Sequence, residues 1–218
     1  MKKILSAVLL IALLAVALVS CKEPEDPTTP PAPEARTTIT AEEWAATCAL
    51  VNYTCTQQAT TVYVIDGVTT TPGFSAIGKS TATATYSKAS EDGEPDVEIY
   101  EVFEDGFCYI VEIVAGSEPS VKKYEYENEP LSEALEFGDT SFEDLVYNAE
   151  TKSYELSKTQ YGADYHFSFY FENGVLVKLT LNASMVDGED SLTMEIVATF
   201  SDIGTTTVEV PAFEKPAA

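Results

Sequence analysis

Hydrophobic and polar residues alternate along much of the chain after residue 53. In segment 165–171 every odd-numbered residue is aromatic, and in segment 175–181 every odd-numbered residue is apolar. Residues 192–200 alternate in the same way, with the apolar residues at even positions. A period of two is typical of β-strands that bury one face. The pattern therefore predicts a meander of antiparallel strands.

Gly-containing turns separate these alternating segments. At Glu172-Asn173-Gly174 a two-residue turn would place Phe169 opposite Lys178, so we expect a three-residue loop with a glycine bulge. That loop predicts the pairs Phe171 with Val175, Phe169 with Val177, and Phe167 with Leu179. The same loop at Glu104-Asp105-Gly106 predicts Ile99 opposite Val111 and Val97 opposite Ile113. Ile65-Asp66-Gly67 is a candidate third case of this three-residue loop, and Asp187-Gly188 predicts a longer turn.

One helix is expected before the first strand. Thr40 and Glu43 have the spacing of a capping box, which predicts a helix over residues 41–52. Trp44, Cys48 and Val51 fall on one face of that helix. We expect this face to pack on a sheet.

The sequence thus predicts a mainly β fold with one N-terminal helix (α+β), a curved antiparallel meander or half-barrel packed on the helix. We assign a single antiparallel β domain to residues 39–213 and a disordered tail to residues 214–218. Residues 130–135 and 141–145 are interpreted as short helical turns between strands.

The first 20 residues have the features of a secretory signal peptide. Lys2 and Lys3 precede an uncharged run over residues 4–19, and this run is shorter than the about 20 apolar residues that span a bilayer. The tetrapeptide Leu18-Val19-Ser20-Cys21 resembles the lipobox of bacterial lipoproteins. The resemblance implies cleavage before Cys21 and attachment of fatty acyl chains such as palmitate to its thiol, which anchors the mature protein to a membrane. An ordinary cleaved signal with a chance cysteine is the alternative.

Residues 21–38 form a Pro-, Thr- and Glu-rich stretch that we interpret as a tether between the anchor and the β domain. Its acidic start, Cys21 to Asp26, resembles the charged signals that send some lipoproteins of Gram-negative bacteria to the outer cell surface. The expected location is therefore the bacterial cell envelope, at the outer membrane or cell surface.

The end of the chain carries a second resemblance. Residues 199–204 and 208–211 resemble the last strands of lipoproteins in the LolA/LppX-like superfamily, whose half-open barrel wraps helices and can carry acyl chains. If the concave face of the sheet is open, its aromatic residues would line an apolar pocket, and if it is filled they form the core. The residues concerned are Trp44, Phe107, Tyr109, Tyr165, Phe167, Phe169 and Phe171. We favour the filled core.

Composition excludes several function classes. The formal net charge of −24 and the lack of a basic stripe argue against a nucleic-acid partner. A single histidine and the absence of a C-x-x-C motif argue against a metal site. The sequence has no glycine-rich phosphate loop, so we predict no cofactor. Besides Cys21 the chain has Cys48, Cys55 and Cys108, for which a Cys48–Cys55 disulfide and free buried thiols both remain open.

No catalytic site is predicted. His166, Asp164 and Ser168 share one strand face, but neighbours two residues apart on a strand lie about 6.5 Å apart and do not form a triad unaided. The carboxylate-rich segments 91–96 and 187–190 are interpreted as solvated turns. The outward-facing Tyr100, Tyr124, Tyr126 and Tyr170 suit contacts with a protein or a glycan.

These observations predict a non-enzymatic, lipid-anchored envelope protein that acts as a binding or structural module. Its membrane contact would be made through Cys21, and its partner would be a protein or a glycan. The alternative is a lipid or lipoprotein carrier that holds an acyl chain between the curved sheet and the helix.

Overall fold

The computed structural model describes residues 35–91, 94–125 and 140–216. Cys21, most of the tether, Tyr126 and the expected helical turn at 130–135 lie outside these residues. Among the helices of the described residues, none has the length and apolar content required to cross a membrane.

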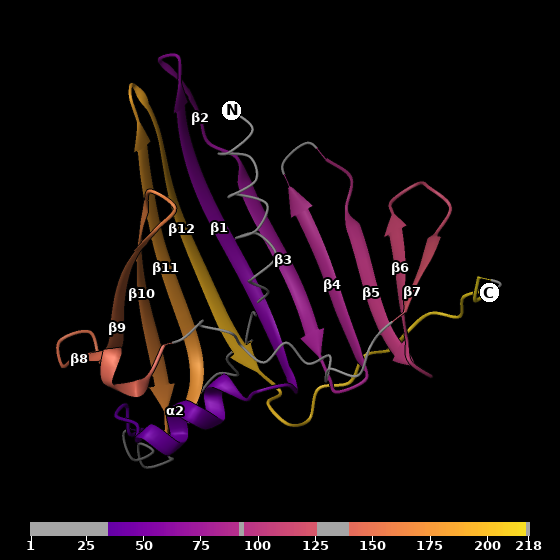
Figure 1. Ribbon diagram of the computed structural model, residues 1–218, viewed down its shortest axis with the longest axis horizontal. Coiled ribbons are helices and arrows are strands. Elements are labelled where there is room, and N and C mark those ends of the chain that lie inside the picture. Colours follow the sequence, from indigo (N-terminus) through magenta and orange to yellow (C-terminus); the bar gives the residue numbers. More distant parts are fainter. Residues whose placement is uncertain (1–34, 92–93, 126–139, 217–218) are drawn as a thin grey trace, which may run out of the picture.

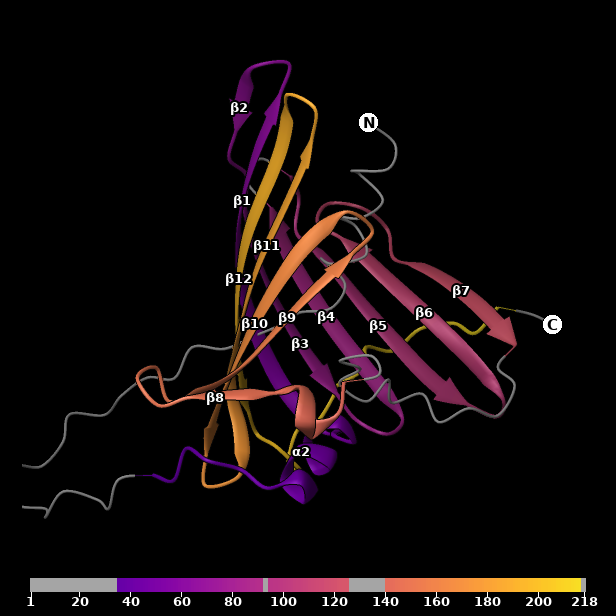
Figure 2. The ribbon, with the colours of Figure 1, turned by 60° about the vertical axis from the view of Figure 1, so that its left-hand side comes forward.

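The described residues form one open, antiparallel, 12-stranded sheet with one short α-helix (Figures 1 and 2). The sheet order is β7-β6-β5-β4-β3-β1-β12-β11-β10-β9-β8, and β2 pairs with β1 outside this order. The mainly β prediction is thereby confirmed. The elements are α2 (Ala41–Cys48), β1 (Tyr53–Ile65), β2 (Val68–Thr70), β3 (Gly73–Ser80), β4 (Ala84–Glu91), β5 (Val97–Glu104), β6 (Phe107–Val114), β7 (Ser120–Glu125), the 3-10 helix η1 (Phe142–Asp144), β8 (Val146–Asn148), β9 (Ser153–Gln160), β10 (Ala163–Glu172), β11 (Val175–Asp187) and β12 (Asp190–Ser201).

Helix α2 begins where its capping box predicts. The Glu43 backbone N–H donates to Thr40 Oγ1 at 3.3 Å, and the Thr40 N–H donates to the Glu43 carboxylate at 2.9 Å. The helix ends at Cys48, four residues earlier than predicted. Asn52 explains the early end, because its side chain exchanges two hydrogen bonds with the Thr206 backbone, at 3.2 and 2.9 Å. These bonds hold the chain in the direction of β1.

The turn of the β10–β11 hairpin differs from the prediction. Asn173 and Gly174 form a two-residue turn, with φ of 53° and 87°, as expected for a type I′ turn. A register shift between Tyr170 and Phe171 then places Phe169 opposite Leu179, not Val177. The predicted pairs are therefore wrong, because a β-bulge and not a longer loop keeps the apolar residues on one face. The observed pairs are Phe171 with Leu176 and Phe167 with Leu181.

The β5–β6 hairpin also has a two-residue turn, at Asp105-Gly106. Without a compensating bulge, Ile99 lies opposite Glu112 and Val111 lies opposite Tyr100, so the predicted register is wrong here too. Asp66-Gly67 also connects β1 to β2 through a two-residue turn, so a hairpin forms there but the three-residue loop is wrong. The expected longer turn at Asp187-Gly188 is wrong. Asp187 pairs with Asp190, which leaves a two-residue turn at residues 188–189.

The two faces of the sheet differ in chemistry. Directly opposed residues of an antiparallel pair point to the same face, so the register assigns every strand residue to one side. We call the side that carries Phe169, Ala198 and Cys55 the core face, and the side that carries His166 and Glu195 the polar face. The buried cluster on the core face comprises Ile39, Trp44, Cys55, Leu145, Tyr154, Leu156, Phe169, Phe171, Leu176, Ala198 and Phe200.

Candidate functional site

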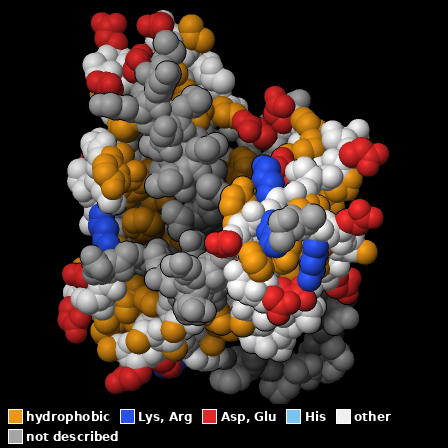
Figure 3. Space-filling model, turned by 45° about the vertical axis from the view of Figure 1, so that its right-hand side comes forward, with side chains coloured by type: hydrophobic (Ala, Val, Ile, Leu, Met, Phe, Trp, Pro, Cys, Tyr) orange, Lys and Arg blue, Asp and Glu red, His pale blue; other side chains and the backbone are white. Residues whose placement is uncertain are grey.

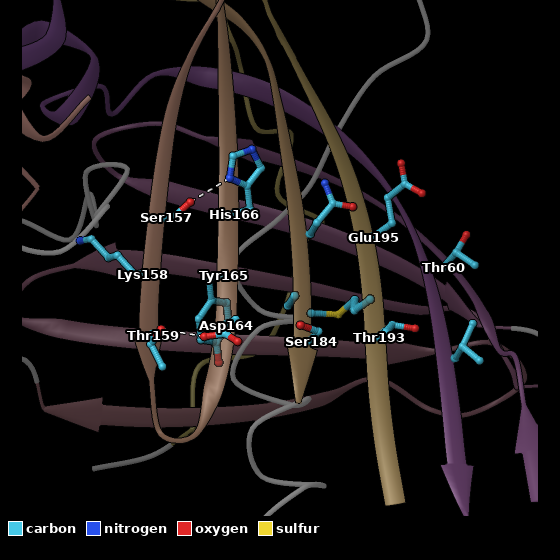
Figure 4. A pocket seen from close by; sticks show the side chains of 14 residues that line it. Thr60, Ser157, Lys158, Thr159, Asp164, Tyr165, His166, Ser184, Thr193 and Glu195 are labelled. Atoms are coloured by element: carbon cyan, nitrogen blue, oxygen red, sulfur yellow. Dashed lines mark hydrogen bonds between the residues drawn. The ribbon is translucent and has the colours of Figure 1, made fainter. Parts of the chain in front are cut away.

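A groove of about 610 Å³ crosses the polar face from β9 to β1. Most of its lining residues carry polar groups, which are hydroxyl, amide, carboxylate and imidazole side chains from five neighbouring strands (Figure 4). The lining residues are Thr60, Val62, Ser157, Lys158, Thr159, Asp164, Tyr165, His166, Asn182, Ala183, Ser184, Thr193, Met194 and Glu195. We call this the β9–β1 groove.

The register explains how these residues come together. Successive strand partners form a row that we call the His166 row, Ser157–His166–Asn182–Glu195–Thr60. A second row lies two positions away from the first on each strand. We call it the Asp164 row, Thr159–Asp164–Ser184–Thr193–Val62. Neighbouring members of a row come from strands about 4.8 Å apart. The groove runs between the two rows.

The floor of the groove is the strand backbone between these rows. Lys158, Tyr165, Ala183 and Met194 occupy the intermediate positions, and alternation directs their side chains to the core face. Burial raises the pKa of Tyr165, with a smaller contribution from Tyr161. The groove therefore presents polar walls and backbone, with Val62 as an apolar member of the walls.

Two cross-strand hydrogen bonds order one end of the groove. Ser157 Oγ and His166 Nδ1 lie 3.0 Å apart, and Thr159 Oγ1 donates to the Asp164 carboxylate at 2.6 Å (Figure 4). Asn182 and Glu195 continue the His166 row with a donor-acceptor amide and an acceptor carboxylate. The walls can thus both donate to and accept from a bound molecule.

The charge of the site disfavours anions. Asp164 and Glu195 contribute two carboxylates, and the whole chain has a formal net charge of −24. Carboxylates are also scattered over the face of the molecule drawn in Figure 3. Like charges in a groove repel an anionic ligand and favour an uncharged or cationic one.

His166 does not form a catalytic triad with the residues next to it on its strand face. The structure joins His166 to Ser157 of β9, a residue that the sequence did not single out, while Asp164 bonds to Thr159. Glu195 stands two strands from His166 in their row, about 9.6 Å away. A nucleophile, base and orienting acid in mutual hydrogen-bond reach would require a much closer carboxylate.

Three of the aromatic residues that would line a pocket on an open concave face pack against one another. Trp44 lies with its ring centroid 5.1 Å from that of Phe169 and 6.5 Å from that of Phe171, both in edge-on geometry. All three side chains are at most 3% exposed. Phe167 stacks between Phe169 and Tyr165, at 6.1 and 6.5 Å. These contacts fill the space around them.

Phe107 and Tyr109 lie elsewhere. The register places them on the polar-face side of β6, opposite to the side that carries Phe169, so the expectation of one continuous aromatic face is wrong. There the C-terminal segment covers them, with Phe213 5.8 Å from Tyr109 and Lys215 bonded to Glu104. The physical reason is the two-residue turn at Asp105-Gly106, which shifts the register of β6.

The remaining candidates are placed as follows. No disulfide joins Cys48 to Cys55; Cys48 and Cys108 are free thiols, and Cys55 is buried. Within the described residues, no cluster of three or more His, Cys, Asp or Glu side chains has the geometry of a metal site. Among the outward-facing tyrosines, Tyr170 stacks under Lys178 and Tyr124 is half exposed.

Comparison with known proteins assigns no family. The sequence matches no protein-family model, and no curated protein matches it significantly. Among solved structures, a DUF1329 family protein from Desulfovibrio piger aligns with a TM-score of 0.24 and 11% identity, over 69% of this chain and 85% of that one. MucB in complex with MucA(peri) aligns with a TM-score of 0.14 and 10% identity, over 76% and 95% of the two chains. The Pseudomonas aeruginosa MucA/MucB complex gives a TM-score of 0.13 and 9% identity, also over 76% and 95%. Scores of this size carry no property over to this chain.

Proposed function

We propose that this protein is a lipid-anchored, non-enzymatic binding module of the bacterial cell envelope, and that its ligand is an uncharged glycan held in the β9–β1 groove. The sequence around Cys21 supports the anchor and the location. The β9–β1 groove supports the binding function, because it is the part of the described surface where polar side chains from five strands converge on a cavity.

The chemistry of the walls favours a glycan over a protein. The buried centre of a protein interface is depleted in charged residues and enriched in aromatic ones. The walls of the groove instead carry hydroxyl groups, one amide, one imidazole and two carboxylates. A sugar presents hydroxyl groups that both donate and accept, which matches this set. The two carboxylates favour an uncharged sugar over a uronic or phosphorylated one.

A glycan array tests the proposal. The mature protein is incubated with immobilised uncharged, amino and acidic oligosaccharides, in parallel with the variant Asn182→Ala. Asn182 stands at the centre of the His166 row, and loss of its amide should reduce binding about tenfold. Thr69→Ala, on the exposed strand β2, is the matched control. Binding to uncharged glycans that Asn182→Ala weakens and Thr69→Ala retains is the expected result.

The following outcomes would contradict the proposal. Failure to bind any glycan, or binding that Asn182→Ala leaves unchanged, would overturn the assignment of the groove. A preference for acidic glycans would overturn the electrostatic argument. Fractionation tests the anchor separately, since Cys21→Ala should move the protein from the membrane to the soluble fraction.

A further inference from the structure

A second cavity, of about 510 Å³, lies on the same face and adjoins the β9–β1 groove. It is lined by Thr56, Gln57, Gln58, Ser75, Ala76, Ile77, Lys88, Ser90, Val197 and Thr199. We call it the β1–β4 groove. Its location follows from the sheet order, in which β12, β1, β3 and β4 are consecutive.

Both grooves share strands β1 and β12. Along β1 the polar-face residues are Thr56 and Gln58, which line the β1–β4 groove, followed by Thr60 and Val62, which line the β9–β1 groove. Along β12 the order is the same, with Thr199 and Val197 in one groove and Glu195 and Thr193 in the other. One step of two residues, about 6.6 Å, separates the grooves. A single chain-like ligand can therefore contact both.

The lining of the β1–β4 groove also carries hydroxyl and amide side chains. Lys88 is its one charged residue, and its ammonium group lies 3.1 Å from Asp96 and 3.2 Å from Glu98. Bonds to these carboxylates raise the pKa of Lys88. The ion pairs leave Lys88 little capacity to attract an anion.

An unpartnered polar atom marks this groove. Thr56 Oγ1 is buried and has no hydrogen-bond partner. Thr56 lies at the junction of β1 and β3, where the two strands pair through Tyr53 and Ser80, in contrast to eleven residue pairs between β1 and β12. A buried hydroxyl group without a partner is costly, and rotation of the Thr56 side chain toward the groove would let a ligand hydroxyl bond to it and remove that cost.

We propose that the β9–β1 and β1–β4 grooves form one extended site that binds a linear, uncharged oligosaccharide across seven strands, from β9 to β4. Six inter-strand steps give the site a length of about 29 Å. This inference rests on the proposed function, because it names the form of the glycan that the β9–β1 groove holds. In this site, the part of the oligosaccharide that extends beyond the β9–β1 groove contacts Gln58, Ser75 and Ser90.

The test is the dependence of affinity on chain length. Isothermal titration uses the mature protein and an oligomer series, from the disaccharide upward, of the glycan that binds best on the array. The affinity should rise with length and reach a plateau when the ligand spans both grooves. Gln58→Ala should weaken the long oligomers about tenfold and leave the disaccharide unchanged, because the exposed Gln58 lines only the β1–β4 groove. Asn182→Ala should weaken all lengths.

Two failures are distinguishable. Equal affinity for short and long oligomers, or a Gln58→Ala variant that binds long oligomers normally, would overturn the extended site and leave the β9–β1 groove assigned. Absence of binding at every length would overturn the proposed function itself. Circular dichroism of each variant checks that the sheet is retained, and Thr69→Ala again serves as the control.

Discussion

Gln57 provides the sharpest test of the energetics of this fold. Its side chain belongs to the core face of β1, opposite Ala198, and is 1% exposed. Neither the amide nitrogen nor the amide oxygen has a hydrogen-bond partner. A buried polar group without a partner costs about 1–3 kcal/mol. Gln57→Met keeps the length of the side chain and removes the amide, so it should stabilise the protein by about 2 kcal/mol.

Urea denaturation measures this effect. With a slope of about 2 kcal/mol per molar urea, a gain of about 2 kcal/mol raises the midpoint by about 1 M. Gln58→Met is the matched control, since the neighbouring side chain is exposed and its replacement should change stability by less than about 0.5 kcal/mol. A lower midpoint for Gln57→Met than for the unmodified protein would refute the reasoning, because it would mean that the amide is satisfied by hydrogen bonds in solution.

Three other perturbations have defined outcomes. Trp44→Ala should lower the free energy of unfolding by about 3–5 kcal/mol, because the indole packs edge-on against two buried rings, and Trp44→Phe should lose less in the same urea assay. Hydrogen bonds from Arg36 and from the Thr40 backbone lower the pKa of Glu43, so its contribution to stability is present above the usual carboxyl pKa and is lost as the pH falls below it. Glu43→Gln should therefore flatten the dependence of the urea midpoint on pH in the acidic range. Burial, with a smaller effect of Glu101, raises the pKa of Cys108 to about 11, so iodoacetamide should alkylate this thiol slowly at mildly alkaline pH and faster after unfolding in urea.

The local features of the fold were accessible from the sequence. The capping box of Thr40 and Glu43 predicts where α2 begins, because it depends on residues three positions apart. The alternation at residues 165–171 predicts a strand for the same reason. The end of α2 was not accessible, since it depends on a contact between Asn52 and Thr206, which lie 154 positions apart.

The polar groove was missed because it depends on register. The predicted β10–β11 register would place His166 opposite Thr180, whereas the observed bulge places it opposite Asn182. A shift of two residues preserves the face of every side chain, so the alternation pattern cannot distinguish the two registers. Rows that cross five strands therefore had no signature in the sequence beyond polar residues at alternate positions. Ser157, the partner of His166, is nine positions away on another strand.

The distribution of apolar residues determines which part of the polar-face side stays open. On β6 that side carries Phe107, Tyr109 and the almost fully buried Val111. Burial of such apolar surface is worth about 25 cal/mol per Å², and the C-terminal segment supplies Phe213 as cover. On β12 the same side carries Thr193 and Glu195, which gain little from a protein cover and lose hydration under it. The polar-face side of the sheet is thus divided into a covered apolar part on β6 and an open polar part from β9 to β4, and a hydroxyl-rich ligand is the kind of cover that the polar part can accept.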